Sequence, residues 1–143
     1  MTPQAFSYAT VGNNGMIYVP PYGLTESIDY MLKMDPTTYE ITKIPLQVDD
    51  STEKWQKGIV HRNLIYFLPY NESSILIVDT NNDNVEYVKI AAKGRGKYIQ
   101  GHIYSNRIIA IPYGEHEHYD YVLDFNMTDH TYKLLKLDVP VKD

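Results

Sequence analysis

A cationic loop with two glycines is the segment whose residue types point most directly to chemistry. It runs Lys93-Gly94-Arg95-Gly96-Lys97, in a chain with a formal net charge of -5. Glycines let a backbone approach a ligand closely, and Arg and Lys donate charge-assisted hydrogen bonds to phosphate or carboxylate. The spacing is not that of a P-loop, and no Ser or Thr follows Lys97. The segment therefore predicts either an anion site or an ordinary solvated turn.

Two histidines alternate with carboxylates in the segment Glu115-His116-Glu117-His118. In a strand, the side chains of His116 and His118 would point to the same side, as a shared metal ion requires. Imidazole and carboxylate are both zinc ligands, but a third ligand would have to come from elsewhere in the fold. A solvated polar loop is the favoured interpretation, metal binding is the lesser alternative, and no cofactor is predicted.

One histidine, His102, is a candidate general base, because it follows Gly101 in a predicted inner strand that could line a channel. Glu72, Glu115 or Glu117 could be its acid partner. The chain has no Gly-x-Ser-x-Gly motif and no cysteine, which removes that esterase signature, thiol catalysis and disulfides from consideration. A binding protein is therefore the favoured function, and a hydrolase or lyase that uses His102 is the alternative.

Aromatic residues recur at fixed places around the cationic loop. Three tyrosines each follow a proline at the end of an apolar run, and Trp55 and Tyr98 stand equally far before the second and third of them. Aromatic side chains gathered with a few polar groups are typical of small-molecule sites. The predicted ligand-binding set is Tyr22, Trp55, Tyr70, Arg95, Lys97, Tyr98 and Tyr113. The alternative is that the repeated aromatic residues are packing elements of the scaffold.

The elements that must position these residues are strands, in a pattern repeated three times. The Pro-Tyr tyrosines lie 48 and 43 residues apart, a period typical of one supersecondary unit copied along a chain. After each tyrosine come a polar loop, a second apolar run, a turn rich in Asn and Asp, and an alternating segment. The second runs end at Asp35, Asp79 and Asp124. Alternation of period two indicates strands with one buried face.

Each unit therefore predicts four short antiparallel strands in about 45 residues, the size of a propeller blade. In the second unit we expect strands near Lys57–Val60, Leu64–Leu68, Ser74–Asp79 and Val85–Ile90. The prediction is one all-β domain over residues 1–143, with blades at about 5–47, 54–91 and 97–139. A plain antiparallel meander or sandwich is the alternative. In a propeller, the Pro-Tyr residues and the cationic loop would share one loop face beside the central channel.

The second unit also resembles a known class of repeat. Gly58-Ile59-Val60, the run from Ile65 to Asn71, and Ile75-Leu76-Ile77-Val78-Asp79 look like Kelch-related and YVTN-type β-propeller repeats. The resemblance spans about residues 7–140 and implies a fold, not a function, because propellers host binding, scaffolding and catalysis alike. The chain lacks the paired glycines of Kelch repeats, the Trp-Asp of WD repeats and the sialidase Asp box, so none of those families' functions is carried over.

Three blades are too few to close a ring, because propellers are typically built from four to eight. A three-bladed arc would leave an apolar face open at each end, and such faces predict association. We therefore expect a homodimer that closes a six-bladed ring. The alternative is that the chain is half of a longer propeller.

Charge and hydropathy exclude several other classes of protein. The negative net charge argues against general nucleic-acid binding, which relies on a basic surface. The sequence has no apolar run of the length that crosses a membrane, and no signal-peptide pattern follows Met1. We expect a cytoplasmic protein whose partners are a second copy of itself and a small anionic molecule or another protein. One form of such a binding protein is a ligand-sequestering antagonist, such as a viral or phage one.

Overall fold

The computed structural model describes residues 5–6, 8–23, 28–49, 52–91, 94–114 and 119–138. Within these residues the chain forms strands and turns without helix. No helix long and apolar enough to span a membrane is found there. The strands of the first sheet are β1 (Thr10–Val11), β2 (Ile17–Val19), β3 (Tyr30–Met34) and β4 (Ile41–Pro45). Those of the middle sheet are β5 (Trp55–His61), β6 (Leu64–Pro69), β7 (Ser74–Asp79) and β8 (Asn84–Lys89). Those of the last sheet are β9 (His102–Tyr104), β10 (Arg107–Ala110), β11 (Tyr121–Asn126) and β12 (Tyr132–Lys136).

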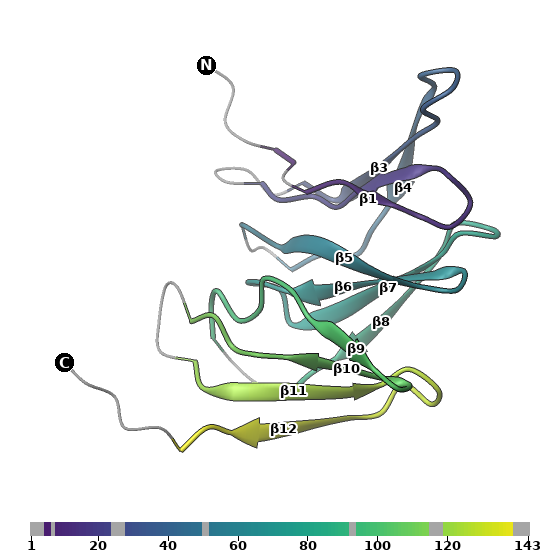
Figure 1. The fold of residues 1–143 in the computed structure, drawn as a ribbon. Coiled ribbons are helices and arrows are strands. Elements are labelled where there is room, and N and C mark those ends of the chain that lie inside the picture. The colour runs from purple at the N-terminus through teal and green to yellow at the C-terminus, as the bar shows by residue number, and fades with distance from the viewer. Residues whose placement is uncertain are drawn as a thin grey trace.

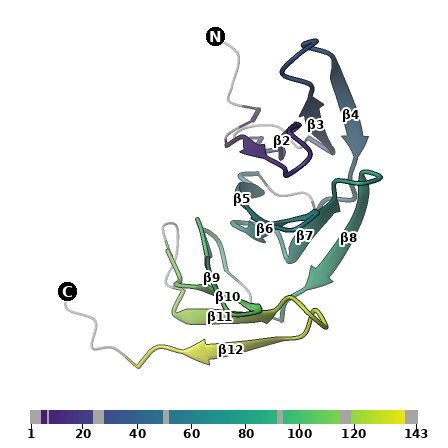
Figure 2. The ribbon, with the colours of Figure 1, turned by 45° about the vertical axis from the view of Figure 1, so that its right-hand side comes forward.

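Each sheet is an antiparallel meander in which every strand pairs with the next one along the chain. The three sheets follow one another in chain order, from β1–β4 at the top of Figure 1 to β9–β12 at the bottom. Figure 2 shows the same succession from a second direction, with β4, β8 and β12 along the outer side. The predicted all-β architecture of three four-stranded units is thus confirmed. The three sheets do not close on themselves.

The turn before the last strand of each sheet has one shared construction. The side chains of Asp35, Asp79 and Asn126 each accept a hydrogen bond from the backbone N–H two residues later. The residue four places on has a positive φ in every case, close to 60°. Such side chains favour these turns because they bond the nearby backbone and tolerate left-handed dihedrals.

One sequence prediction is corrected here. The third apolar run was expected to end at Asp124, but β11 continues to Asn126, where the turn begins. Arg107, the first residue of β10, pairs with Asn126, and Ile109 pairs with Asp124. In the middle sheet the matching pairs are Leu64 with Asp79 and Tyr66 with Ile77. Asn126 is therefore the structural counterpart of Asp79, and it was missed because Asn and Asp serve equally well in this turn.

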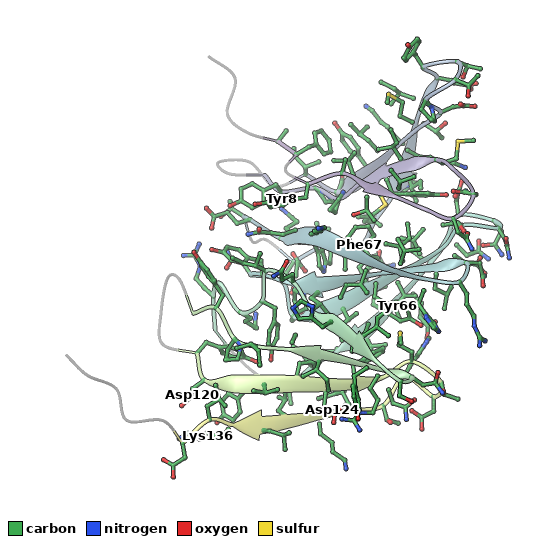
Figure 3. The ribbon with its side chains drawn as sticks, in the orientation of Figure 1. Tyr8, Tyr66, Phe67, Asp120, Asp124 and Lys136 are labelled. Carbon is green, nitrogen blue, oxygen red and sulfur yellow. The ribbon has the colours of Figure 1, made fainter. Side chains whose placement is uncertain are left out.

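Two apolar clusters lie between the sheets and use alternate residues of the middle one. Ile65 and Phe67 of β6 join the cluster shared with the first sheet, and Tyr66 and Leu68 join the cluster shared with the last sheet. Tyr66 and Phe67 are neighbours in sequence and are both labelled in Figure 3. Because strand side chains alternate between faces, a strand that is buried on both sides must be apolar throughout, as β6 is.

Candidate functional site

The faces of the sheets are named here by direction. The preceding face of a sheet is directed toward the sheet before it in the chain, and the following face toward the sheet after it. The first sheet has an open preceding face and the last sheet an open following face, because the described residues form no sheet beyond them.

Three aromatic residues of the predicted ligand-binding set are packing elements in the structure. Trp55, Tyr70 and Tyr98 have no exposed surface. The Trp55 indole N–H donates to the carbonyl of Ser74 at 2.9 Å, and the Tyr98 hydroxyl donates to the carbonyl of Tyr121 at 2.9 Å. Burial raises the pKa of the Tyr98 phenol well above its ordinary value. These contacts match the alternative in which the repeated aromatic residues hold the scaffold together.

Lys97, the last cation of the predicted anion loop, is also buried, with 2% of its surface exposed. Its Nζ donates to the carbonyl of Glu72 at 2.9 Å. Its backbone joins two sheets, because the Lys97 N–H donates to the carbonyl of Tyr70 and its own carbonyl accepts from the Tyr113 N–H. The observed role of Lys97 is structural, and its role in ligand binding remains a prediction.

Arg95 is the exposed cation in the described part of the loop. It stands between Gly94 and Gly96, whose φ values of 142° and 65° lie in the region that favours glycine. The Gly96 N–H donates to the Asn71 side chain at 2.7 Å, and the Gly96 carbonyl accepts from the Gly114 N–H at 2.7 Å. These bonds hold Arg95 next to the Pro112-Tyr113 segment. Lys93 lies outside the described residues.

The other two tyrosines of the set have partly open side chains. Tyr113 is 52% exposed, and its ring centroid lies 6.3 Å from that of Tyr70. Tyr22 is half-buried, at the corresponding end of the first sheet. The structure therefore brings Arg95 and Tyr113 together, and it places Tyr22 two sheets away from them.

His102, the candidate general base, is exposed in β9 on the following face of the last sheet. It lines an open pocket of about 430 Å³ with Ile99, Gln100, Ile111, Pro112 and Tyr113. Glu72 is 3% exposed, and its carboxylate accepts from the Asp49 N–H at 3.3 Å. In the described part of the chain no carboxylate is seen in a hydrogen bond with His102. Among the described residues, His102 therefore lies beside a pocket without a hydrogen-bonded carboxylate, and its role as a base remains a prediction.

The predicted His-x-His metal segment is not part of the described structure. His116 and His118, with Glu115 and Glu117, lie outside the described residues. Among the residues that are described, no group of three His, Asp or Glu side chains could hold a metal ion.

Sequence reasoning missed the residues that distinguish the two end sheets. Val11 and Ile41 on the first sheet are each 59% exposed, and Ile111 and Leu135 on the last sheet are 59% and 52% exposed. Their signal was present in the sequence, because they stand at repeat positions that are apolar in every sheet. Comparison of equivalent strand positions in the three repeats shows this shared apolar character.

The comparisons with known proteins show a fold and no family. No family model and no curated protein matches the chain. Two solved structures from B. thetaiotaomicron are similar to it, the extracellular domains of BT4673 described as a hybrid two-component and as a one-component system. They are each 11% identical, cover 91% and 92% of this chain, and have TM-scores of 0.66 and 0.67. This chain spans 16% of the length of each, so the likeness concerns the arrangement of the sheets alone.

Proposed function

We propose that the protein is a binding module built from β-propeller-type blades and completed by association through its end sheets. The observation that carries the proposal is the open preceding face of the first sheet. Ile17, Val19, Leu32 and Met34 are apolar there and only partly buried. Their counterparts in the middle sheet, Ile65, Phe67, Leu76 and Val78, are fully buried against a neighbouring sheet. An apolar face kept at all of these positions supports a partner that covers it.

Native mass tests the association. Light scattering of the chain at micromolar concentration should give at least twice the chain mass of 16.6 kDa. A stable and soluble monomer would refute the proposed association. Association is expected to persist at high salt, because burial of apolar surface is not screened as exposed ion pairs are.

The loop face is the proposed binding surface for a small anionic ligand or a protein partner. Arg95 supports this assignment because it is exposed on a backbone fixed by Gly96, which is bonded to Gly114, the residue after the half-exposed Tyr113. A guanidinium presents a planar fork that a phosphate or carboxylate can accept in two bonds, and the tyrosine ring could stack on a flat part of the ligand.

Calorimetric titration with a panel of nucleotides and sugar phosphates tests the loop face. Arg95→Ala should weaken binding by roughly 1.5–3 kcal/mol, the worth of a hydrogen bond to a charged group, or about 10- to 150-fold in Kd. Arg62→Ala is the matched control, because Arg62 is an exposed arginine in the turn at the opposite end of β5. If the wild type binds no anion, or both variants bind equally well, the loop is a turn and nothing more.

A propeller enzyme is the second candidate, supported by the position of His102 in the 430 Å³ pocket. A hydrolase or lyase activity that is lost in His102→Gln and retained in Arg95→Ala would favour it. A cytoplasmic location stays a prediction, and the two similar structures are extracellular domains.

A further inference from the structure

The two internal contacts between sheets are built from the same parts, and the first part is a small residue in the innermost strand. The Gly58 N–H donates to the Thr10 hydroxyl at 2.9 Å, and a Cβ on Gly58 would lie 2.9 Å from that oxygen. A Cβ on Gly101 would lie 3.1 Å from the Ile59 side chain of the middle sheet. At each contact, a side chain on the following face of one sheet therefore lies directly over a glycine of the next.

The second part is the positive-φ residue of the turn before the outermost strand. Asp83 of the middle sheet reaches back to the first sheet, where it accepts from the Tyr18 hydroxyl at 2.8 Å and pairs with Lys33 at 2.6 Å. His130 of the last sheet reaches back in the same way, and its ring lies 6.0 Å from that of Tyr66. Each turn residue thus contacts the following face of the preceding sheet.

The third part is a backbone ladder at the Pro-Tyr ends. The Tyr22 carbonyl accepts from the Lys54 N–H at 3.2 Å, and the Tyr70 carbonyl accepts from the Lys97 N–H at 2.9 Å. An aromatic residue follows each lysine, Trp55 in one case and Tyr98 in the other, and both are fully buried. The first two Pro-Tyr segments are thereby each joined to the start of the next sheet.

The open preceding face of the first sheet carries its own copy of all three parts. The Ala5 carbonyl accepts from the Tyr22 N–H, just as the Lys54 carbonyl accepts from the Tyr70 N–H. Phe6, the residue after Ala5, therefore corresponds to Trp55 and Tyr98. Thr10 pairs with Tyr18 as Ile59 pairs with Tyr66, so Ala9 is the small residue that corresponds to Gly58. Tyr39 is the positive-φ turn residue, and it is 75% exposed.

The open following face of the last sheet carries the matching receptors. His102 pairs with Ile109 and so corresponds to Thr10 and Ile59, the side chains that lie over glycine. Ile109 and Asp124 correspond to Tyr18 and Lys33, which receive the turn residue. Among the described residues, no backbone hydrogen bond is seen to the Tyr113 carbonyl, which corresponds to those of Tyr22 and Tyr70.

We propose that the following face of the last sheet binds the preceding face of the first sheet of a second copy of this chain. Ala9 of one copy then lies under His102 of the other, and Phe6 enters the pocket lined by His102, Ile111 and Tyr113. Tyr39 packs on Ile109 and donates its hydroxyl to the Asp124 carboxylate, the reverse of the bond from Tyr18 to Asp83. This inference rests on the proposed association and adds the partner and the register.

The pairing is head to tail, so two different surfaces meet and the assembly must either close or extend as a filament. Two copies supply six sheets, which lies within the range of four to eight blades at which propeller rings close. Closure uses both open faces of both copies at once. It covers Ile111 and Leu135 on one side, and Val11 and Ile41 on the other, which are among the large exposed apolar residues of these faces.

Cysteine cross-linking tests the register, and the absence of natural cysteine makes each introduced thiol unique. Ala9→Cys and His102→Cys are made as single variants, because at the corresponding contact a Cβ on Gly58 would lie 2.9 Å from the Thr10 hydroxyl oxygen, one bond from the Thr10 Cβ, which is close enough for a disulfide. After mild oxidation, an equal mixture of the two should give a covalent species of twice the chain mass on denaturing gels. Neither single variant, oxidised alone, should give this covalent species. Ser105→Cys, exposed in the same β9–β10 hairpin, replaces His102→Cys in the control mixture and should not cross-link with Ala9→Cys.

A variant carrying both Ala9→Cys and His102→Cys tests closure. A closed ring gives one discrete covalent dimer, whereas a ladder of larger species refutes closure. Equal cross-linking in the control mixture, or in either single variant alone, refutes the register. If light scattering shows association of the wild type and the mixture does not cross-link, this inference fails and the proposed association stands. If the wild type is monomeric, both fail.

Discussion

Tyr70 and Tyr113 occupy the same repeat position in the middle and last sheets. Alanine substitution at each position therefore compares the contribution of a buried ring to stability with that of a half-exposed ring. Tyr70 has no exposed surface, and removal of its ring leaves a cavity between the middle and last sheets. Truncation of a buried large aromatic residue to alanine costs about 3–5 kcal/mol. Tyr113 is 52% exposed and is covered on one side only. We expect Tyr113→Ala to cost less than about 1 kcal/mol at low protein concentration.

Urea unfolding followed by far-ultraviolet circular dichroism measures this difference. With a slope of about 2 kcal/mol per molar urea, Tyr70→Ala should lower the midpoint by roughly 1.5–2.5 M. That is a large share of the 5–15 kcal/mol that stabilises a typical domain, so the variant is expected to unfold at low denaturant. Tyr113→Ala should hold the wild-type midpoint in dilute protein. At high concentration it should lose the stabilisation that association provides, because its ring lines the pocket proposed for Phe6.

Equal losses in Tyr70→Ala and Tyr113→Ala at low concentration would refute this reasoning. That result would mean that the open face of the last sheet is already covered in the isolated chain. A near-neutral Tyr70→Ala would refute the assignment of the Pro-Tyr tyrosines as packing elements and would restore Tyr70 to the ligand site.

Three further outcomes follow from the contacts between the first and middle sheets. Gly58→Ala should cost about 1–3 kcal/mol in urea unfolding, because its Cβ would lie 2.6 Å from Ile65 and 2.8 Å from Phe67 of the same sheet, and 2.9 Å from the Thr10 hydroxyl of the first sheet; a neutral result would show that these neighbours can shift to make room. Burial, followed by the hydrogen bond and charge of Asp83, raises the pKa of Tyr18 from 10.0 to about 12, against the lowering effect of the bond from Asn14. The folded state therefore holds this proton more tightly, so the contribution of the Tyr18 hydroxyl to stability is complete below pH 10 and is lost as the pH rises toward 12. Tyr18→Phe should flatten the dependence of the unfolding free energy on pH in this range. An unchanged dependence would contradict the assignment. Asp83→Asn should destabilise by about 1 kcal/mol and reduce the dependence of the midpoint on salt, since it removes the charge paired with Lys33 at 2.6 Å; a salt dependence equal to that of the wild type would count against this pair.

Local patterns were sufficient to predict the strands of the middle sheet. Ser74–Asp79 was predicted with the observed bounds, and the other three strands were placed to within two residues at either end. Period-two alternation and Asx turns act over a few neighbouring residues, so the sequence carries them directly. The third turn was misplaced by two residues because its position depends on how far β11 pairs with β10, which is a property of two strands together.

The exposure of the candidate site residues could not be predicted from the sequence, because exposure depends on what lies against a face. Trp55, Tyr98 and Lys97 were chosen for their side-chain chemistry, yet the neighbouring sheet buries all three. Arg95 and Tyr113 had the same signal in the sequence and remain exposed or partly exposed. No pattern within one strand distinguishes these two outcomes.

By itself, then, the sequence determined three copies of a four-stranded unit and apolar residues on both faces of each, because these follow from period and turn chemistry along the chain. Only the tertiary structure decided which of the three equivalent residues at a repeat position is buried against a neighbouring sheet. Ile65 and Ile108 are buried and Ile17 is not, although all three occupy one repeat position, because in the described part of the chain no sheet lies before the first one. Burial is a relation between two surfaces, and a repeat unit encodes only one of them.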